Sequence, residues 1–227
     1  MKRSDESKVE QVLTAGLPVR LHVRTDLHLA RKLWHMSMGL LLIAVYMSGM
    51  SRATAVVTLS SILGLDLFLE MARLHLPVFN EKVMRFWGPI MRNYERDRFS
   101  GVPYYLAAAA LAVGIFPKTI AVLAIAYLAC GDPIASLAGI LFGHKGKKFK
   151  NGKSLVGTVA GVLVCSILTF IFISSSHLGD QYVLALTFIG GVAGGSAELL
   201  PLEVDDNFSI PIVSGFVLWL AFIILGI

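Results

Sequence analysis

Long apolar segments separated by polar connectors are the feature that most constrains this chain. They cover approximately residues 33–50, 53–72, 102–117, 119–142, 154–174, 181–197 and 209–226, and they approach the roughly 20 residues that a helix needs to cross a bilayer. The composition is 56% hydrophobic and the mean hydropathy is +0.72, above the usual balance of a soluble domain. Because backbone polar groups in lipid must be satisfied within the segment, helices are expected. The sequence therefore predicts an all-α, polytopic transmembrane helix bundle of about seven spans.

Basic residues alternate between connectors and so predict the orientation. Lys and Arg gather before residue 33, in the connector 73–101 and in the loop 143–153, whereas the other turns carry few. By the positive-inside rule the N-terminus is cytoplasmic, and the net charge of +5 reflects topology rather than nucleic-acid binding. Residues 1–28 are expected to form a polar cytoplasmic arm and 29–227 a single transmembrane catalytic domain. The connector 73–101 alternates aromatic and Arg residues and is expected to lie along the interface as a helical piece.

Asp132 is a carboxylate inside an otherwise apolar segment. Its insertion costs about 2.5–3.5 kcal/mol, so such a residue normally faces a polar cavity or a partner. Gly131 and Pro133 flank it, and proline removes a backbone donor from a helix. We therefore expect the span to be interrupted here, with Asp132 lining a cleft.

The loop after this span ends in Gly152, Lys153 and Ser154. Gly146 lies one residue too far upstream for the phosphate-loop pattern, and no strand precedes the loop, so a P-loop fold is excluded. Ser154 nevertheless opens the next helix, whose free N–H groups favour phosphate, and Lys153 adds a mobile cation. Gly157 and Gly161 predict tight helix packing.

Acidic residues follow the sixth apolar segment. Four glycines within residues 190–195 permit close backbone approach and irregular geometry. Glu198, Asp205, Asp206 and Asn207 come next, and such oxygen ligands suit Mg²⁺ together with substrate phosphates. On the same face as a basic loop, they predict a nucleotide–Mg²⁺ pocket.

Two further charged groups lie near the first two spans. The first contains Arg31, Lys32 and His35, and the second contains Asp66, Glu70 and Arg73. The second set shares one helix face by its spacing. The two groups can form a buried ion-pair network that joins the first two spans, or they can support a site.

These residues, in this order, resemble the family of CTP-dependent lipid kinases that includes dolichol, phytol and CTP-type diacylglycerol kinases. The resemblance covers nearly all of the chain after residue 28. It rests on RKLWH at 31–35, DLFLEMAR at 66–73, RNYERDRFSG at 92–101, GDPIASLAGILFG at 131–143, GKSLVGTVAG at 152–161 and AELLPLEVDDNFSIPIVSG at 197–215. It implies transfer of the γ-phosphoryl of CTP to the hydroxyl of a membrane lipid alcohol, a polyprenol or phytol-type isoprenoid or a diacylglycerol.

The expected roles combine these patterns. Asp132, Lys153 and Glu198 are candidate catalytic residues, and Asp132 can serve either as a metal ligand or as the base for the lipid hydroxyl. Nucleotide binding is assigned to Lys145, Gly152, Lys153, Ser154, Gly157 and Asn207. Mg²⁺ or another divalent cation is assigned to Asp132, Asp205 and Asp206, with Glu198 as a further candidate. Supporting or phosphate-steering roles are assigned to Arg31, Lys32, His35, Asp66, Glu70, Arg73, Arg92 and Glu95.

Two other functions use similar features. A cytidylyltransferase that transfers CMP from CTP to a phospholipid acid needs similar charges. A transporter also builds sites from interrupted glycine-rich spans, although its substrate usually lies at the midplane, whereas the charges here gather at one face. The predicted partners are a lipid alcohol, a nucleotide and the bilayer, without nucleic acid. The predicted location is a cytoplasmic (inner) membrane with the active site on the cytoplasmic face, and the lipid, the nucleobase and the oligomeric state stay open.

Overall fold

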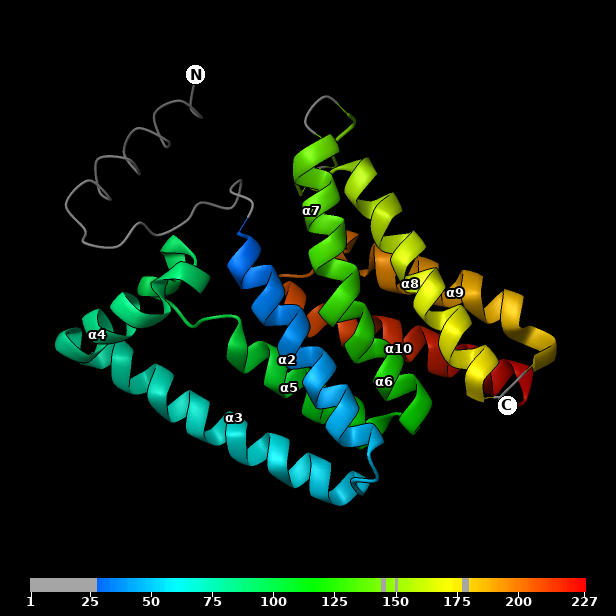
Figure 1. Cartoon of the computed structure of the whole chain (residues 1–227), viewed down its shortest axis with the longest axis horizontal. Coiled ribbons are helices and arrows are strands. Elements are labelled where there is room, and N and C mark those ends of the chain that lie inside the picture. Colours follow the sequence, from blue (N-terminus) through cyan, green and yellow to red (C-terminus); the bar gives the residue numbers. More distant parts are fainter. Residues whose placement is uncertain (1–27, 144–145, 150, 177–179) are drawn as a thin grey trace.

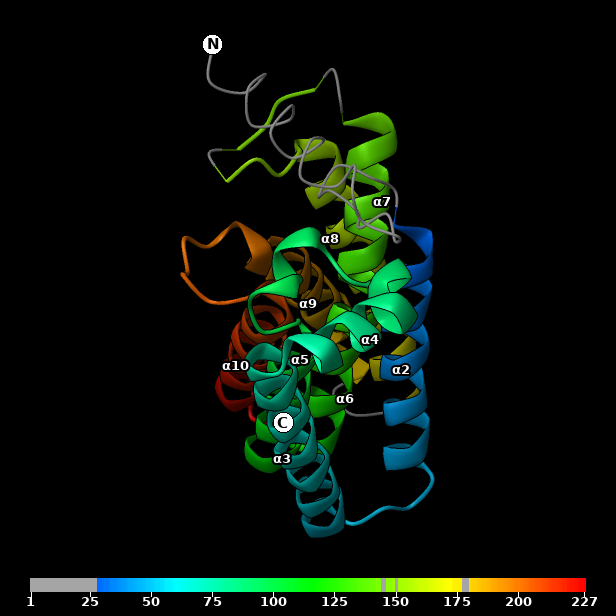
Figure 2. The same ribbon diagram turned by 90° about the vertical axis from the view of Figure 1, so that its left-hand side faces the viewer.

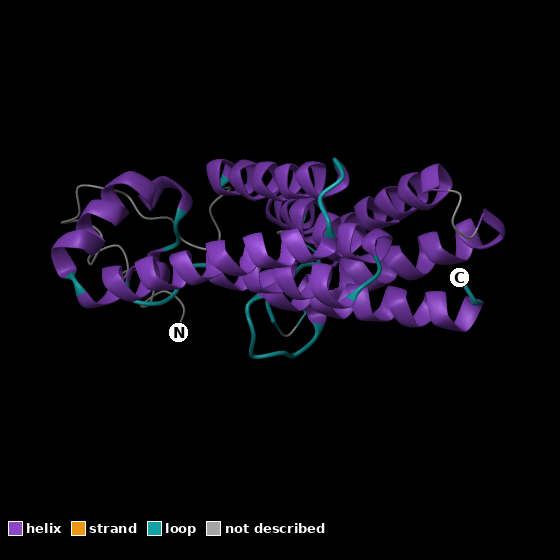
Figure 3. Ribbon diagram, turned by 90° about the horizontal axis from the view of Figure 1, so that it is seen from below, coloured by secondary structure: helices purple, strands orange, loops and turns teal. Residues whose placement is uncertain are grey.

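The computed structural model describes residues 28–143, 146–149, 151–176 and 180–227. Within these ranges the chain is mostly helical and contains no β-strand (Figure 3), which confirms the all-α prediction. The main helices are α2 (Leu29–Met47), α3 (Arg52–His75), α4 (Pro77–Trp87), α5 (Val102–Ile115), α6 (Lys118–Ala126), α7 (Asp132–Phe142), α8 (Leu155–Ser176), α9 (Val183–Ser196) and α10 (Asp206–Leu225).

The core is built around α6. Every side chain from Ile120 to Leu128 is 6% exposed or less, because neighbouring helices cover α6 on all sides. Figure 1 shows the continuous α6–α7 path rising through the middle of the molecule, and Figure 2 shows α2 and α10 on opposite sides of it. A helix that is apolar all round is typical of such a buried position.

The sequence predicted an interruption of the helix at Asp132. The α6–α7 path does not break there but passes through one π-helical turn, η3 (Tyr127–Gly131). The Asp132 N–H donates to the carbonyl of Tyr127, five residues earlier. Pro133 follows directly and has no N–H to donate. The interruption therefore takes the form of a wider turn, a feature that is frequent at functional sites, and the helix continues to Phe142.

Glycines bring α8 and α9 into close contact. A Cβ added to Gly195 would meet the backbone of Val162 on α8, and one added to Gly194 would meet the Cys165 sulfur and the Tyr127 ring. The predicted close approach is confirmed. The irregular geometry that these glycines permit does not occur, because they lie inside regular α9, where close packing against α8 compensates for their low helix propensity.

The outer helices expose apolar side chains, as lipid contact requires. On α3, Val57, Leu65 and Phe68 are each at least 60% exposed. In the described part of the chain, four segments are long and apolar enough to cross a membrane: Arg52–His75, Lys118–Phe142, Leu155–Ser176 and Asp206–Leu225. Val102–Ile115 and Val183–Leu199 are apolar but shorter. Each segment predicted from the sequence coincides with a helix, while the count of about seven spans and the orientation stay predictions.

The connector between α3 and α5 is helical in pieces, as predicted. It contains α4 and two short 3-10 turns, η1 (Gly88–Ile90) and η2 (Asn93–Arg96). Pro77 is at the start of α4, where its missing N–H costs nothing. In Figure 1 this connector lies at the left of the molecule, beside the beginning of α2, and the C-terminus lies at the right.

Candidate active site

Lys153 is the centre of the charged site. Its Nζ donates to Glu198 Oε2 at 2.6 Å and to Asp206 Oδ2 at 2.8 Å. The three residues come from three elements: the loop before α8, the short turn η5 (Ala197–Leu199) after α9, and the first turn of α10. Glu198 is 8% exposed. The structure thus joins the two motifs, GKS and the acidic cluster, that the sequence predicted to share one pocket.

Asp132 belongs to the same electrostatic group. Burial alone would lower the pKa of Lys153, but the carboxylates of Asp132, Glu198 and Asp206 outweigh it and raise that pKa above its ordinary value. The Lys153 ammonium therefore keeps its charge at every physiological pH. Asp132 also interacts electrostatically with Lys32 and Arg92, so cations from three parts of the chain surround one carboxylate.

The loop that carries Lys153 is held by its own hydrogen bonds. Gly152 has a φ of +84°, a conformation that favours glycine. Asn151 Nδ2 donates to the carbonyl of Glu198 at 3.1 Å, and its Oδ1 accepts from the Lys153 N–H at 3.1 Å. These bonds fix the base of the Lys153 side chain beside Glu198. Lys145, the other predicted nucleotide contact in this loop, lies outside the described residues.

Ser154 and Gly157 stabilise the start of α8 and its packing against α7. Ser154 Oγ accepts from the Gly157 N–H at 3.0 Å, which is an N-cap interaction. A Cβ on Gly157 would lie 2.7 Å from the Ala135 carbonyl oxygen and 3.2 Å from the Gly139 Cα. Gly157 thus lets α7 and α8 touch, and this confirms the predicted packing face. The nucleotide-binding roles of Ser154 and Gly157 stay predictions.

The start of α10 is also capped from within. Asp205 Oδ1 accepts from the Asn207 N–H at 2.9 Å. Burial raises the pKa of Asp205, and this backbone hydrogen bond opposes that shift. The amide of Asn207 is buried and donates to the Gly101 carbonyl at 3.4 Å. Asn207 therefore ties α10 to the start of α5, and its predicted contact with nucleotide stays a prediction.

Arg31 and Glu95 form a second, bidentate pair. Arg31 donates to both Glu95 oxygens, at 2.8 and 2.9 Å. Glu95, which is 1% exposed, also accepts from the backbone N–H groups of Arg92 and Gly101. One carboxylate thus joins α2, the η2 turn and the start of α5. The side chain of Arg92 donates to the hydroxyl of Tyr94.

Glu70 and Arg73 form a third pair. Arg73 Nε and Nη2 donate to Glu70 at 2.7 Å each, and Arg73 also donates to the carbonyls of Arg96 and Arg98. The pair fastens α3 to the connector that follows it, whereas Arg31 joins α2 to Glu95. Arg73 thus finds its carboxylate on the helix face predicted for it, whereas Arg31 pairs with the connector and not with an acid of the second span. Asp66 Oδ2 is buried without a hydrogen-bond partner in the described part of the chain.

The predicted metal set does not form a three-ligand group. Among the described residues, no three His, Cys, Asp or Glu side chains lie close enough together to hold a metal ion. Asp205 caps α10, and Asp206 is paired with Lys153. Glu198 and Asp206, however, place carboxylate oxygens on one nitrogen. Proteins usually bind Mg²⁺ with one or two carboxylates, and substrate phosphates complete its coordination. The pair of Glu198 and Asp206 therefore fits Mg²⁺.

Two polar residues near the site were missed by the sequence analysis. Thr158 is 7% exposed, and its hydroxyl has no hydrogen-bond partner in the described ranges. It lies one turn after Ser154, within the GKSLVGT motif, which was the signal available. Tyr105 on α5 likewise has a buried hydroxyl without a partner. No sequence pattern marks Tyr105, because its position depends on how α5 packs.

Together the fold and the site define a helical membrane protein with a buried cluster of opposite charges where several helices end. No protein-family model matches the chain, and no solved structure does. Among curated proteins, it is 30% identical to the CTP-dependent diacylglycerol kinase 1 of Schizosaccharomyces pombe over 161 residues, which cover 66% of this chain and 73% of the relative.

Two more relatives extend the match. The chain is 30% identical to the CTP-dependent diacylglycerol kinase 1 of Eremothecium gossypii over 204 residues, covering 81% of this chain and 64% of that one. It is 27% identical to the chloroplastic farnesol kinase of Arabidopsis thaliana over 210 residues, covering 87% and 66%. The chain therefore spans about two thirds of the length of these relatives, and it belongs to the CTP-dependent lipid kinase family.

Proposed function

We propose that this protein transfers the γ-phosphoryl group of CTP to the hydroxyl of a membrane lipid alcohol. The observation that carries the proposal is the Lys153 ammonium held between Glu198 and Asp206 beside Asp132, at the ends of apolar helices. The relatives are named as CTP-dependent diacylglycerol kinases and a farnesol kinase, which supports both the donor and the kind of acceptor. The chemistry asks for positioning and charge neutralisation rather than covalent catalysis.

The cations around Asp132 suit the donor nucleotide. Lys153, Lys32 and Arg92 each interact electrostatically with Asp132. A triphosphate that enters among them would meet three positive charges, and Lys153 is free to exchange its carboxylate partners for phosphate oxygens. Glu198 and Asp206 would then hold Mg²⁺, which neutralises phosphate charge when bound.

Asp132 lies where the lipid alcohol would meet the charged cluster around Lys153. It follows the π turn and is partly buried, so it can face both the polar cluster and the apolar helices. We assign Asp132 one of two roles: it accepts the proton of the attacking hydroxyl, or it binds Mg²⁺. We also propose that this end of the bundle faces the cytoplasm, where CTP is found, as the positive-inside rule predicts.

The test uses the purified full-length protein in vesicles with Mg²⁺, candidate lipid alcohols and CTP labelled separately at the α and γ phosphorus. Label that enters lipid only from the γ position, with CDP as the second product, establishes the kinase. Label only from the α position would make the protein a cytidylyltransferase. If neither label enters any lipid, the proposed reaction is wrong and substrate transport becomes the function to test.

A further inference from the structure

Two buried polar groups, one on α2 and one on α5, lie near the π turn that precedes Asp132 and have no hydrogen-bond partner among the described residues. His35 Nε2 on α2 and Tyr105 Oη on α5 are both inaccessible to solvent and make no hydrogen bond to any described residue. Their rings contact each other edge to face, with centroids 4.9 Å apart and an interplanar angle of 78°. An unpaired buried polar group costs about 1–3 kcal/mol. Two of them in one ring contact point to a missing ligand.

The π turn fixes which nitrogen of His35 is available. The ring interacts with the backbone of Leu128, and we assign this contact to Nδ1, because Nε2 has no partner among the described residues. A continuing π turn would pair the Leu128 carbonyl with residue 133, which is a proline and has no N–H. The carbonyl is therefore left to accept from His35 Nδ1–H. In the neutral ring this leaves Nε2 as a hydrogen-bond acceptor.

The position of Tyr105 depends on a glycine. A Cβ added to Gly39 on α2 would overlap the Tyr105 hydroxyl and the Cβ of Ala129. Gly39 therefore makes the room in which this hydroxyl lies, beside the π turn. A phenolic hydroxyl can donate a hydrogen bond, so the pair presents one acceptor and one donor.

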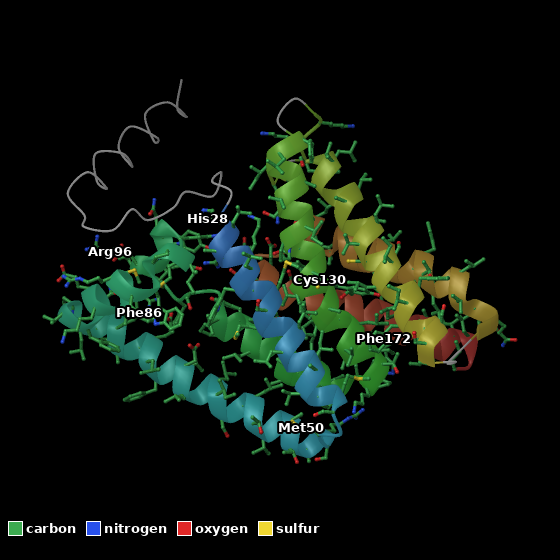
Figure 4. The ribbon with its side chains drawn as sticks, in the orientation of Figure 1. His28, Met50, Phe86, Arg96, Cys130 and Phe172 are labelled. Carbon is green, nitrogen blue, oxygen red and sulfur yellow. The ribbon has the colours of Figure 1, made fainter. Side chains whose placement is uncertain are left out.

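The pair lies on the same segment as the proposed chemistry. His35 interacts electrostatically with Asp132, and Tyr105 interacts with Cys130. Figure 4 shows Cys130 in the middle of the molecule, where α2 passes the α6–α7 path. His35 and Tyr105 therefore flank residues 128–132 on the side of the apolar helices α2 and α5, while Lys153 reaches the group from the loop before α8.

We propose that His35 Nε2 and Tyr105 Oη form the binding subsite for the hydroxyl of the acceptor lipid. A lipid hydroxyl satisfies both groups at once, because its O–H donates to Nε2 and its oxygen accepts from the Tyr105 O–H. This inference rests on the proposed function and replaces the phosphate-steering role that the sequence suggested for His35. Its ligand is a lipid with a free alcohol, as opposed to an acid or an ester.

The subsite would orient the nucleophile for transfer. The alcohol oxygen forms a bond to the γ-phosphorus, the bond from that phosphorus to the bridging oxygen breaks, and CDP leaves with the electron pair. The hydroxyl proton passes to the carboxylate of Asp132, the base proposed above, as the hydroxyl exchanges its hydrogen bond to His35 Nε2 for one to Asp132. His35 and Tyr105 are binding residues in this account, so their loss should weaken acceptor binding more than donor binding.

The test compares three single-site variants in vesicles with CTP and a saturating range of lipid alcohol. Tyr105→Phe removes only the hydroxyl. His35→Asn keeps a donor for the Leu128 carbonyl and removes the acceptor at Nε2. Thr187→Val is the matched control, because the Thr187 hydroxyl is also buried without a partner in the described part of the chain but lies in the second turn of α9, far along the helix from Glu198. Thermal melting in detergent verifies folding.

We expect the first two variants to raise the KM for the alcohol about 3- to 10-fold each, the cost of one hydrogen bond, with the KM for CTP unchanged. Thr187→Val should leave both constants unchanged. A competitive inhibitor identical to the lipid but with hydrogen in place of the hydroxyl should bind wild type and variants equally.

Two results would overturn the subsite while leaving the kinase intact: unchanged alcohol KM in both Tyr105→Phe and His35→Asn, or an equal rise in the KM for CTP. A loss of affinity for the inhibitor without the hydroxyl would also overturn it, because the defect would then concern the lipid chain. Failure of the wild type to transfer γ label refutes the proposed function instead, and the two failures are thereby separated.

Discussion

The ammonium of Lys153 and the carboxylate of Glu198 lie 2.6 Å apart, although 45 residues separate them in the chain. The contact spans α8 and α9, whose glycine-mediated packing brings the loop before α8 against the turn that follows α9. The helix packing in the apolar part of the molecule therefore determines the geometry of its polar site. A substitution that disturbs the helix packing should therefore change the activity of the polar site, and a substitution in the site should change the stability of the helix bundle.

Replacing Lys153 tests this directly. Lys153→Met removes the cation and leaves the buried carboxylate of Glu198 without its partner, whereas Asp206, whose side chain is 40% exposed, can be hydrated. We expect γ-phosphoryl transfer to fall more than about 100-fold, as expected for loss of an electrostatic contact to the transferring group, and the folded state to lose about 2 kcal/mol. Labelled-CTP assays and thermal melting measure the two effects. Lys147→Met, at an exposed lysine of the same loop, is the control, and an equal loss there would show that the loop acts only through its net charge.

Asp132→Asn separates chemistry from folding. The amide keeps the size of the side chain but removes the charge that Lys32, Arg92 and Lys153 surround. We expect turnover to be abolished while the protein stays folded. The measurement pairs single-turnover γ transfer with equilibrium CTP binding. If Asp132 is the base, CTP should bind more tightly to the variant, because a negative charge next to the phosphates is lost; if Asp132 holds Mg²⁺, CTP should bind more weakly. Near-normal turnover would remove Asp132 from the mechanism.

Much of the fold followed from the sequence, because helix length and hydrophobicity are local properties. The expected helices, the Gly157 packing face and the meeting of the GKS and acidic motifs appear in the structure. The π turn at Asp132 was missed. Gly131 and Pro133 signalled an irregularity, but whether a helix breaks or widens depends on the packing of its neighbours.

The ion pairs were harder to predict, for a related reason. Arg31 could have paired with an acid on α3, yet it pairs with Glu95 of the connector. Sequence spacing shows which charges share a helix face, but not which partner a loop will present to them. Tyr105 illustrates the same limit, because its relevance depends on the contact of its ring with His35.

Glu95 should be the most important carboxylate for stability in the connector. It is almost fully buried and accepts from Arg31 and from the N–H groups of Arg92 and Gly101. Glu95→Gln leaves the Arg31 charge without its partner, which costs about 3–5 kcal/mol in a buried pair. We expect a lower thermal midpoint. Asp97→Asn, at an exposed acid two residues later, should leave the midpoint unchanged, and equal melting of the two variants would contradict a structural role for Glu95.

Gly157→Ala tests the link between helix packing and the site. The added methyl group would clash with the Ala135 carbonyl oxygen and the Gly139 Cα. Both are backbone atoms, so a change of side-chain rotamer cannot relieve the clash. Separating α7 from α8 should cost about 1–3 kcal/mol and displace Lys153, so both stability and γ transfer should fall. The matched variant is Gly64→Ala on α3, where nothing lies within 4 Å of the new methyl group. It should be neutral or stabilise the helix by up to about 1 kcal/mol, and kinase activity should be unchanged. Equal melting and equal activity in the two variants would show that contact at Gly157 does not position the site.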